Sequence, residues 1–349
     1  MNKRIFAADL LLLITAAVWG FGFVAQRSGM QYVGPFAFNG VRFPLGSLFL
    51  LPVIVWQRRK RLKAENSESG TAGKGNIRAE KWTKRKILFF SSFLTGTCLF
   101  IAVTFQQLGI MFTTAGNAGF ITGLYVILTP IFGIFLGRKT GIATWIGAIF
   151  TLTGLYFLSL VGPLGSINPG DILIIISAVF WTFHVLIIDR LVQKTDPIEL
   201  SGGQFVFAGF YALVAAFLLE PVLSHRLENL SPELLASGVF GWKSFPTLIG
   251  GLTAGTIPVS LVSDALIPIL YGGLVSVGIG YTLQVVAQKN APPAHATIIL
   301  CLEGSFAALG GVLLLNEPLG KRTITGFVLM FAGMLVSQWE QIASHNKKA

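Results

Sequence analysis

Apolar runs of about twenty residues, bounded by glycine, proline or charged residues, follow one another along the chain. This length suits an α-helix that crosses a bilayer, because in hydrocarbon every backbone amide must be paired within its own segment. The alternating strands of a membrane β-barrel are not seen in the pattern. It predicts ten transmembrane helices, at residues 6–25, 36–56, 87–107, 115–136, 142–160, 171–189, 198–219, 264–287, 294–315 and 323–341.

Composition also indicates a membrane protein. Only 12% of the 349 residues are charged and 53% are hydrophobic, whereas a soluble chain has about 25% charged residues. The first run follows Lys3 and Arg4 but is longer than the apolar core of a secretory signal, so we expect it to be retained as the first span. Cys98 and Cys301 lie inside apolar runs, which argues against a disulfide framework or a zinc site; no metal and no cofactor are expected.

Basic residues are distributed unevenly along the chain, whose net charge is +11. With a cytoplasmic N-terminus, 20 of the 26 Lys and Arg residues fall in cytoplasmic segments and 5 in outside segments, while Arg42 lies within a span. This bias predicts that both termini are cytoplasmic, and it makes the charge an orientation signal rather than a nucleic-acid footprint. The segment 57–86, with eleven basic and three acidic residues, is predicted to be a disordered linker; attraction to anionic lipid headgroups is the alternative.

The two halves of the chain resemble each other. Offsets of 162, 178 and 179 residues relate Trp19 to Trp181, Phe43 to Phe205, Gln106 to Gln284, Ala118 to Ala296, Gly147 to Gly326, and Gly154 to Gly333. The predicted domains are 1–160, which contains the linker 57–86, and 161–349, which contains a long outside loop at 220–263. Because each half has an odd number of spans, the halves must be inverted relative to one another. The predicted fold is an all-α membrane protein of two inverted five-helix repeats around a central cavity, an arrangement typical of alternating-access carriers.

Three stretches resemble the drug/metabolite transporter superfamily and, within it, the EamA family of ten-span carriers. They are AAVWGFGFVAQR from residue 16 with VRF at 41–43, TTAGNAGFITGLYVILTP from residue 113, and LLLNEPLGKRTITGFVLMFAG from residue 313. The resemblance covers both halves. It implies two inverted repeats around a cavity and, for most members, export of small metabolites such as amino acids. Where the family often has Glu-Pro in the ninth span, this chain has Glu303 followed by Gly304, without the proline that would break the helix.

Ionisable groups within the spans are candidates for function because each costs about 2.5–3.5 kcal/mol on insertion scales. Glu303, near the middle of the ninth span, is a candidate proton-binding carboxylate or contact for a cationic substrate; the alternative is a buried partner for Arg42 or a hydrogen-bonded helix contact. Arg42 either holds a substrate carboxylate or snorkels to the headgroups. His184 either serves a proton relay or packs as a neutral side chain. His295, after two prolines, is expected at the membrane interface.

A second set of candidates shares polar or aromatic side chains within spans, which would line a pocket at the pseudo-two-fold axis. The set is Trp19, Trp181, Gln106, Gln284, Asn117, Tyr125 and Tyr281. Ordinary helix packing is the alternative for each of them. The sequence has no metalloprotease motif, complete phosphate loop, nucleophile elbow or paired catalytic carboxylates, so we predict no enzyme and no catalytic residue.

These observations predict a secondary transporter that moves a small organic metabolite, amino-acid-like or drug-like, across the bacterial cytoplasmic (inner) membrane by alternating access. Efflux is the direction that the family resemblance implies. The expected partners are the small-molecule substrate, the lipid bilayer and protons as the coupling ion, without nucleic acid. A flippase for a lipid-linked group and a passive channel of the same fold are the alternatives.

Overall fold

The described residues of the first half of the chain form six helices. The computed structural model describes residues 3–30, 32–68, 74–112, 115–159, 169–223, 225, 259–315 and 320–346. The helices before residue 160 are α1 (Lys3–Gly29), α2 (Pro35–Glu68), α3 (Lys74–Ile110), α4 (Ala115–Gly123), α5 (Tyr125–Phe135) and α6 (Ile142–Ser159). The regular elements described here are all helical.

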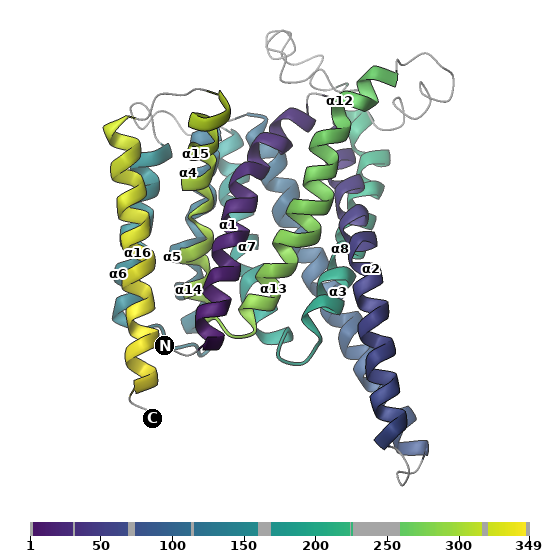
Figure 1. Cartoon of the computed structure of the whole chain (residues 1–349). Helices are drawn as coiled ribbons and strands as arrows, with labels where there is room; N and C mark the ends of the chain where they lie inside the picture. The colour runs from purple at the N-terminus through teal and green to yellow at the C-terminus, as the bar shows by residue number, and fades with distance from the viewer. Residues whose placement is uncertain are drawn as a thin grey trace.

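The second half continues in the same way, with one helix of a different kind. Its elements are α7 (Pro169–Leu191), α8 (Pro197–Leu218), α12 (Val259–Leu270), the π-helix η1 (Tyr271–Tyr281), α13 (Thr282–Gln288), α14 (Pro293–Leu300), α15 (Glu303–Leu315) and α16 (Lys321–Asn346). Figure 1 shows the helices side by side in one bundle, with the start of α1 and the end of α16 at its lower end. The predicted outside loop 220–263 lies mostly beyond the described residues.

Among the residues that the structure describes, seven helical segments are long and apolar enough to cross a membrane, so the chain is a multi-pass membrane protein. They are Lys3–Gly22, Pro35–Ala64, Trp82–Ile110, Ala118–Phe135, Pro169–Leu191, Pro197–Leu218 and Asp264–Gln288. Two further apolar helices, Ile142–Leu158 and Pro293–Leu309, are shorter. The total of ten crossings therefore stays a prediction.

The outside of the bundle is apolar and its interior holds polar side chains, the reverse of a soluble protein. Phe135, Ile142 and Ile267 are 80%, 79% and 77% exposed, whereas Gln204 and Arg42 are 0% and 2% exposed. Such a surface suits contact with lipid tails, and polar groups in such a bundle are expected on the inside.

The linker 57–86 is helical on both sides of residues 69–73, so the prediction of disorder was wrong. α2 continues to Glu68, and α3 begins at Lys74. Lys, Arg, Ala and Glu are good helix formers, and extending an existing helix needs no new nucleus. Ion pairs of Arg58 and Arg61 with Glu199 also fasten this part of α2 to the start of α8.

The fourth and ninth predicted spans are each interrupted near the middle. α4 and α5 meet at Leu124, and α14 and α15 meet at residues 301–302. At these joints a backbone amide bonds the carbonyl three residues back instead of four: Leu124 to Ile121 at 3.1 Å, and Leu302 to Ile299 at 3.0 Å. The ninth span is thus interrupted without the proline that many family members have there.

Helices α6 and α16 pack with their backbones in close approach. A Cβ atom built on Gly147 would lie 2.6 Å from the carbonyl oxygen of Gly333, and one built on Gly154 would lie 2.7 Å from that of Gly326. Only glycine leaves enough room for this contact, as in the small-residue interfaces common among membrane helices.

Candidate functional site

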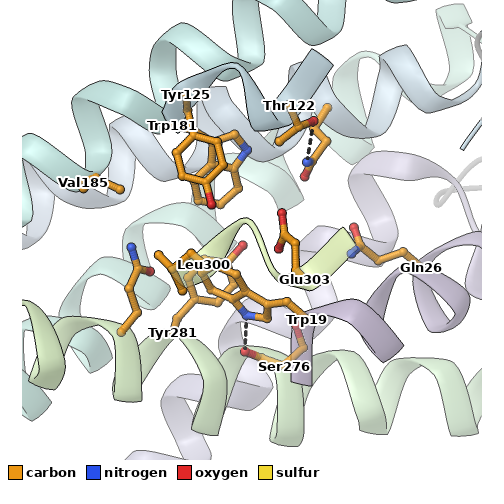
Figure 2. Close-up of a pocket in the computed structure, with 12 residues that line it drawn as sticks. Trp19, Gln26, Thr122, Tyr125, Trp181, Val185, Ser276, Tyr281, Leu300 and Glu303 are labelled. Atoms are coloured by element: carbon orange, nitrogen blue, oxygen red, sulfur yellow. Dashed lines mark hydrogen bonds between the residues drawn. The ribbon is translucent and has the colours of Figure 1, made fainter. Parts of the chain in front are cut away.

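A small cavity lies where the interrupted helices meet α1, α7 and η1, and Figure 2 shows its walls. Its lining residues are Trp19, Gln26, Gln106, Thr122, Tyr125, Trp181, Val185, Ser276, Tyr281, Gln284, Leu300 and Glu303. The cavity measures about 30 Å³, which is room for roughly one or two water molecules. An organic ligand therefore requires the surrounding helices to move apart.

Three aromatic rings form one wall of this cavity. Trp19 lies 4.5 Å from Tyr281 and 6.2 Å from Trp181, measured between ring centroids. Trp181 and Tyr281 are stacked at 5.9 Å with an interplanar angle of 12°. The Trp19 indole is fixed by a 3.3 Å hydrogen bond from its Nε1 to the carbonyl oxygen of Ser276 in η1. Stacked rings of this kind present a flat apolar face to an organic ligand.

Glu303 is the one acidic or basic side chain in the lining. It is the first residue of α15, where the partial positive charge of a helix N-terminus favours an anion. Figure 2 shows its carboxyl group pointing into the pocket, with the Gln26 side chain beside it. Within the described part of the chain it forms no ion pair with Arg42, so the structure does not show the packing alternative raised from the sequence.

Amide side chains close two other sides of the pocket. Gln106 of α3 donates a 3.2 Å hydrogen bond from Nε2 to Thr122 Oγ1. Gln284 of α13 donates to Gln288 at 3.1 Å, and Gln288 donates in turn to the carbonyl oxygen of Val185 at 3.1 Å. The Oε1 atom of Gln284 is buried without a partner, which leaves it available to a ligand donor.

Seven of the ten candidate residues line the pocket, and two others lie elsewhere. His184 is buried behind Trp181, with its Nε2 atom 3.0 Å from Gln204 Oε1. Arg42 of α2 lies under the ring of Phe43, outside the lining. The side chain of Asn117 is not among those that the structure describes.

Several lining residues had no distinguishing signal in the sequence. Gln26 lies near the end of α1, and Ser276 lies within η1. A single serine in a membrane helix ordinarily bonds its own backbone, so its residue type gives no hint of a cavity. Val185 and Leu300 are common apolar residues, and only the packing of α7 against α14 brings them to the pocket.

A second cavity of about 430 Å³ lies toward the lower end of α5 in Figure 1, between α5, α6 and the start of α14. Its lining includes Arg138, Lys139 and His295. His295 is 1% exposed. Its Nε2 lies 2.9 Å from Asp9 Oδ1, and its Nδ1 lies 2.8 Å from Ser337 Oγ. The side chain thus fastens α14 to α1 and α16 from a buried position.

A multi-span bundle with a narrow polar cavity at interrupted helices is an arrangement found in membrane transporters. The chain matches the EamA-like transporter family over residues 6–160 and again over residues 168–338. It is therefore a member of the EamA-like transporter family.

Similar proteins span a wide range of organisms. An uncharacterized transporter of Archaeoglobus fulgidus is 28% identical over 340 residues, which cover 96% of this chain and 87% of the relative. A WAT1-related protein of Arabidopsis thaliana is 21% identical, with coverage of 97% and 89%. A solved crystal structure shares the fold, with a TM-score of 0.65 at 15% identity and coverage of 95% and 96%.

Proposed function

We propose that this EamA-like transporter is a secondary carrier that moves a small organic metabolite by alternating access through the pocket around Glu303. The main support for this proposal is a pocket at two interrupted helices. It combines stacked aromatic rings, the unpartnered amide oxygen of Gln284 and the carboxylate of Glu303. Aromatic walls with a few polar groups are typical of organic-ligand sites. No enzymatic step is proposed.

The proposed architecture is a pair of inverted five-helix repeats, and contacts between equivalent residues support it. Trp19 and Trp181, which the offset of 162 relates, lie 6.2 Å apart, and so do the rings of Phe43 and Phe205. Residues related by a two-fold axis contact each other only near that axis. The proposed axis therefore passes through the aromatic wall of the pocket.

Contacts away from this axis occur in matching pairs. The close approach of Gly147 to Gly333 has its counterpart in that of Gly326 to Gly154, as the offset of 179 requires. The two interruptions correspond as well, because an offset of 178 relates Leu124 to residue 302. Discontinuous helices that meet at the middle of inverted repeats form the substrate sites of many carriers.

Alternating access is supported by the difference between the two cavities. The central pocket holds about 30 Å³ of space, whereas the lower cavity holds about 430 Å³. We assign the lower cavity to the cytoplasmic side, because Arg138 and Lys139 line it and positive residues favour that side. In this proposal the substrate passes between the lower cavity and the central pocket when α5 and α14 separate.

The proposed setting is the cytoplasmic membrane of a bacterium, with both termini in the cytoplasm. The start of α1, the end of α16 and the basic extension of α2 share one end of the bundle in Figure 1. The positive-inside bias assigns this end to the cytoplasm. Export as the direction of transport rests on the family resemblance.

Protons are the proposed coupling ion, bound by Glu303. The substrate is first identified by comparing metabolites inside and outside cells with and without the gene. Uptake of that substrate into proteoliposomes is then driven by a pH gradient. We expect Glu303→Gln to abolish gradient-driven uptake while keeping substrate exchange, since an amide cannot release a proton. Glu199→Gln, at an ion-paired carboxylate outside the pocket, is the matched control.

The same assay separates the carrier from its alternatives. Substrate on the far side accelerates uptake through a carrier, whereas a passive channel shows no such trans-stimulation. If only amphipathic substrates with lipid tails are moved, the protein is a flippase. Gradient-driven uptake that persists in Glu303→Gln would refute the role of Glu303.

A further inference from the structure

Arg42 is a buried cation without a counter-ion. The residue is 2% exposed, and no carboxylate of the described residues pairs with its guanidinium group. Arginine stays protonated in proteins, so the charge cannot be removed by loss of a proton. The snorkelling considered from the sequence is not what the structure shows, because the side chain lies inside the protein.

The immediate surroundings of Arg42 offer it little compensation. Its Cζ atom lies 5.3 Å from the ring centroid of Phe38 and 5.1 Å from that of Phe43. Its Nε donates a 2.9 Å hydrogen bond to Asn39 Oδ1. Aromatic faces and one neutral acceptor offset only part of the cost of burying a charge. The four N–H groups on the two terminal nitrogens remain without a described acceptor.

Asn39 supplies a second unpartnered donor at the same place. Its side chain is 1% exposed, and its Nδ2 amide is buried without a hydrogen-bond partner. The bond from Arg42 holds the Asn39 amide with its oxygen toward the guanidinium. Two buried donor groups on one turn of α2 therefore share a surplus of N–H groups over acceptors. Burying such groups unpaired is costly, so a missing acceptor is indicated.

At the equivalent position of the second half, the neighbouring side chain contacts an acceptor oxygen and not a donor. The offset of 162 relates Arg42 to Gln204, whose Oε1 lies 3.0 Å from His184 Nε2. The same offset relates His184 to Gly22, which has no side chain. The Nε2 amide of Gln204 is buried without a hydrogen-bond partner, as the Asn39 amide is, so each half buries a donor without an acceptor at this position.

A buried carboxylate near the start of α2, that of Glu220, binds a backbone amide. Glu220 is 0% exposed and accepts a 2.7 Å hydrogen bond from the backbone amide of Ala37. From the π-helix, Gly272 faces Arg42, since a Cβ built on it would lie 3.5 Å from the Cδ of Arg42. Glycine at this position lets the side chains of Phe38 and Arg42 pack closely against η1, since the same Cβ would lie 3.2 Å from Cζ of Phe38. π-Helical segments frequently occur at functional sites, and η1 also supplies Tyr281 and Ser276 to the central pocket.

We infer that Arg42 and Asn39 form a buried anion-binding site between α2 and η1, which takes a monovalent anion, either the carboxylate of a small organic molecule or chloride. The guanidinium binds two oxygens or one halide through its terminal N–H groups, and the Asn39 amide adds another donor. The site borders the aromatic wall of the central pocket: the ring of Phe43 lies against Arg42 and 6.1 Å from the ring of Tyr281.

The experiment is thermal unfolding of the purified full chain in nanodiscs, with sodium chloride or sodium acetate added at constant ionic strength set by sodium sulfate. A ligand that binds only the folded state raises the unfolding temperature with the logarithm of its concentration above Kd. We expect this rise in the wild type and its loss in Arg42→Gln. Asn39→Ala keeps the Arg42 guanidinium and should weaken the apparent affinity about tenfold.

The controls make each outcome decisive. Arg58→Gln removes an arginine that is ion-paired at the surface, and it should keep the full dependence on the anion. A response to acetate alone identifies an organic carboxylate, and a response to chloride alone identifies the inorganic ion. The inference is refuted if neither anion shifts the wild type, or if the shift is unchanged in Asn39→Ala. Because this readout involves no transport, its failure is independent of the failure of the carrier proposal.

Discussion

Replacement of Gly147 by alanine tests the close packing of α6 against α16. The added methyl group would lie 2.6 Å from the carbonyl oxygen of Gly333 and 3.0 Å from Cβ of Ser337. Ordinary contact begins at 3.4 Å, so the helices must separate by about 0.8 Å at this point. A gap of this size forfeits about a quarter to a half of the dispersion energy between facing atoms. Allowing for the better helix propensity of alanine, we expect a net loss of about 1–2 kcal/mol.

The assay is unfolding of the reconstituted protein, with Gly320→Ala as the matched control. A Cβ at Gly320 meets no atom within 4 Å, so this substitution should leave stability unchanged. Gly333→Ala places a methyl group 2.5 Å from the carbonyl oxygen of Gly147 and opens the same gap. The double variant should therefore lose less than the sum of the single losses, by about 0.5 kcal/mol or more. Wild-type stability of Gly147→Ala, or strictly additive losses, would show that the helices do not meet here.

Two other regions give equally direct tests. Asp9→Ala removes the hydrogen-bond partner of His295 Nε2, and we expect a loss of about 1–3 kcal/mol in the same unfolding assay, because a buried polar group is left unsatisfied; unchanged stability would contradict the buried contact. For the orientation of the protein, Lys60→Cys should resist an impermeant thiol reagent in intact cells while Gly320→Cys reacts, and the reverse labelling would overturn the proposed topology. Both native cysteines are buried, which keeps the background low.

The positions of the helices could be predicted because apolar runs report where the chain lies in hydrocarbon. Their ends could not, since hydropathy marks where the chain leaves the membrane and not where its helix stops. The extension of α2 to Glu68 depends on helix propensity and on ion pairs with Glu199 of α8. The π-helix η1 packs closely against α2: a Cβ at Gly273 would lie 2.6 Å from Leu45 Cδ2, and one at Gly278 would lie 2.7 Å from Phe49 Cδ1. Such contacts arise only when α2 and η1 come together.

The candidate site could be predicted where a residue type is rare inside a membrane helix. Glu303, Trp19 and Trp181 stood out in this way, and the structure places them together at the pocket. The direction of each side chain was not readable, because a helix that is apolar all round gives no inward face. The sequence therefore could not show that Arg42, equally rare in a span, lies behind Phe43 and outside the pocket lining.

The proposed carrier combines a framework that repeats in both halves with charged residues that do not. Paired residues such as Trp19 and Trp181 meet at 6.2 Å and surround the proposed axis. Glu303 and Arg42 have no charged counterpart in the other half. The offset of 178 relates Glu303 to Tyr125, and the offset of 162 relates Arg42 to Gln204. Two interchangeable halves give inward and outward states of similar energy, so a symmetric framework alone has no preferred direction. A bias of the equilibrium must come from groups that bind a proton or an anion in one half only. In the proposed carrier, Glu303 and Arg42 would therefore set the balance between the two states, whereas the aromatic rings would hold the substrate in either of them.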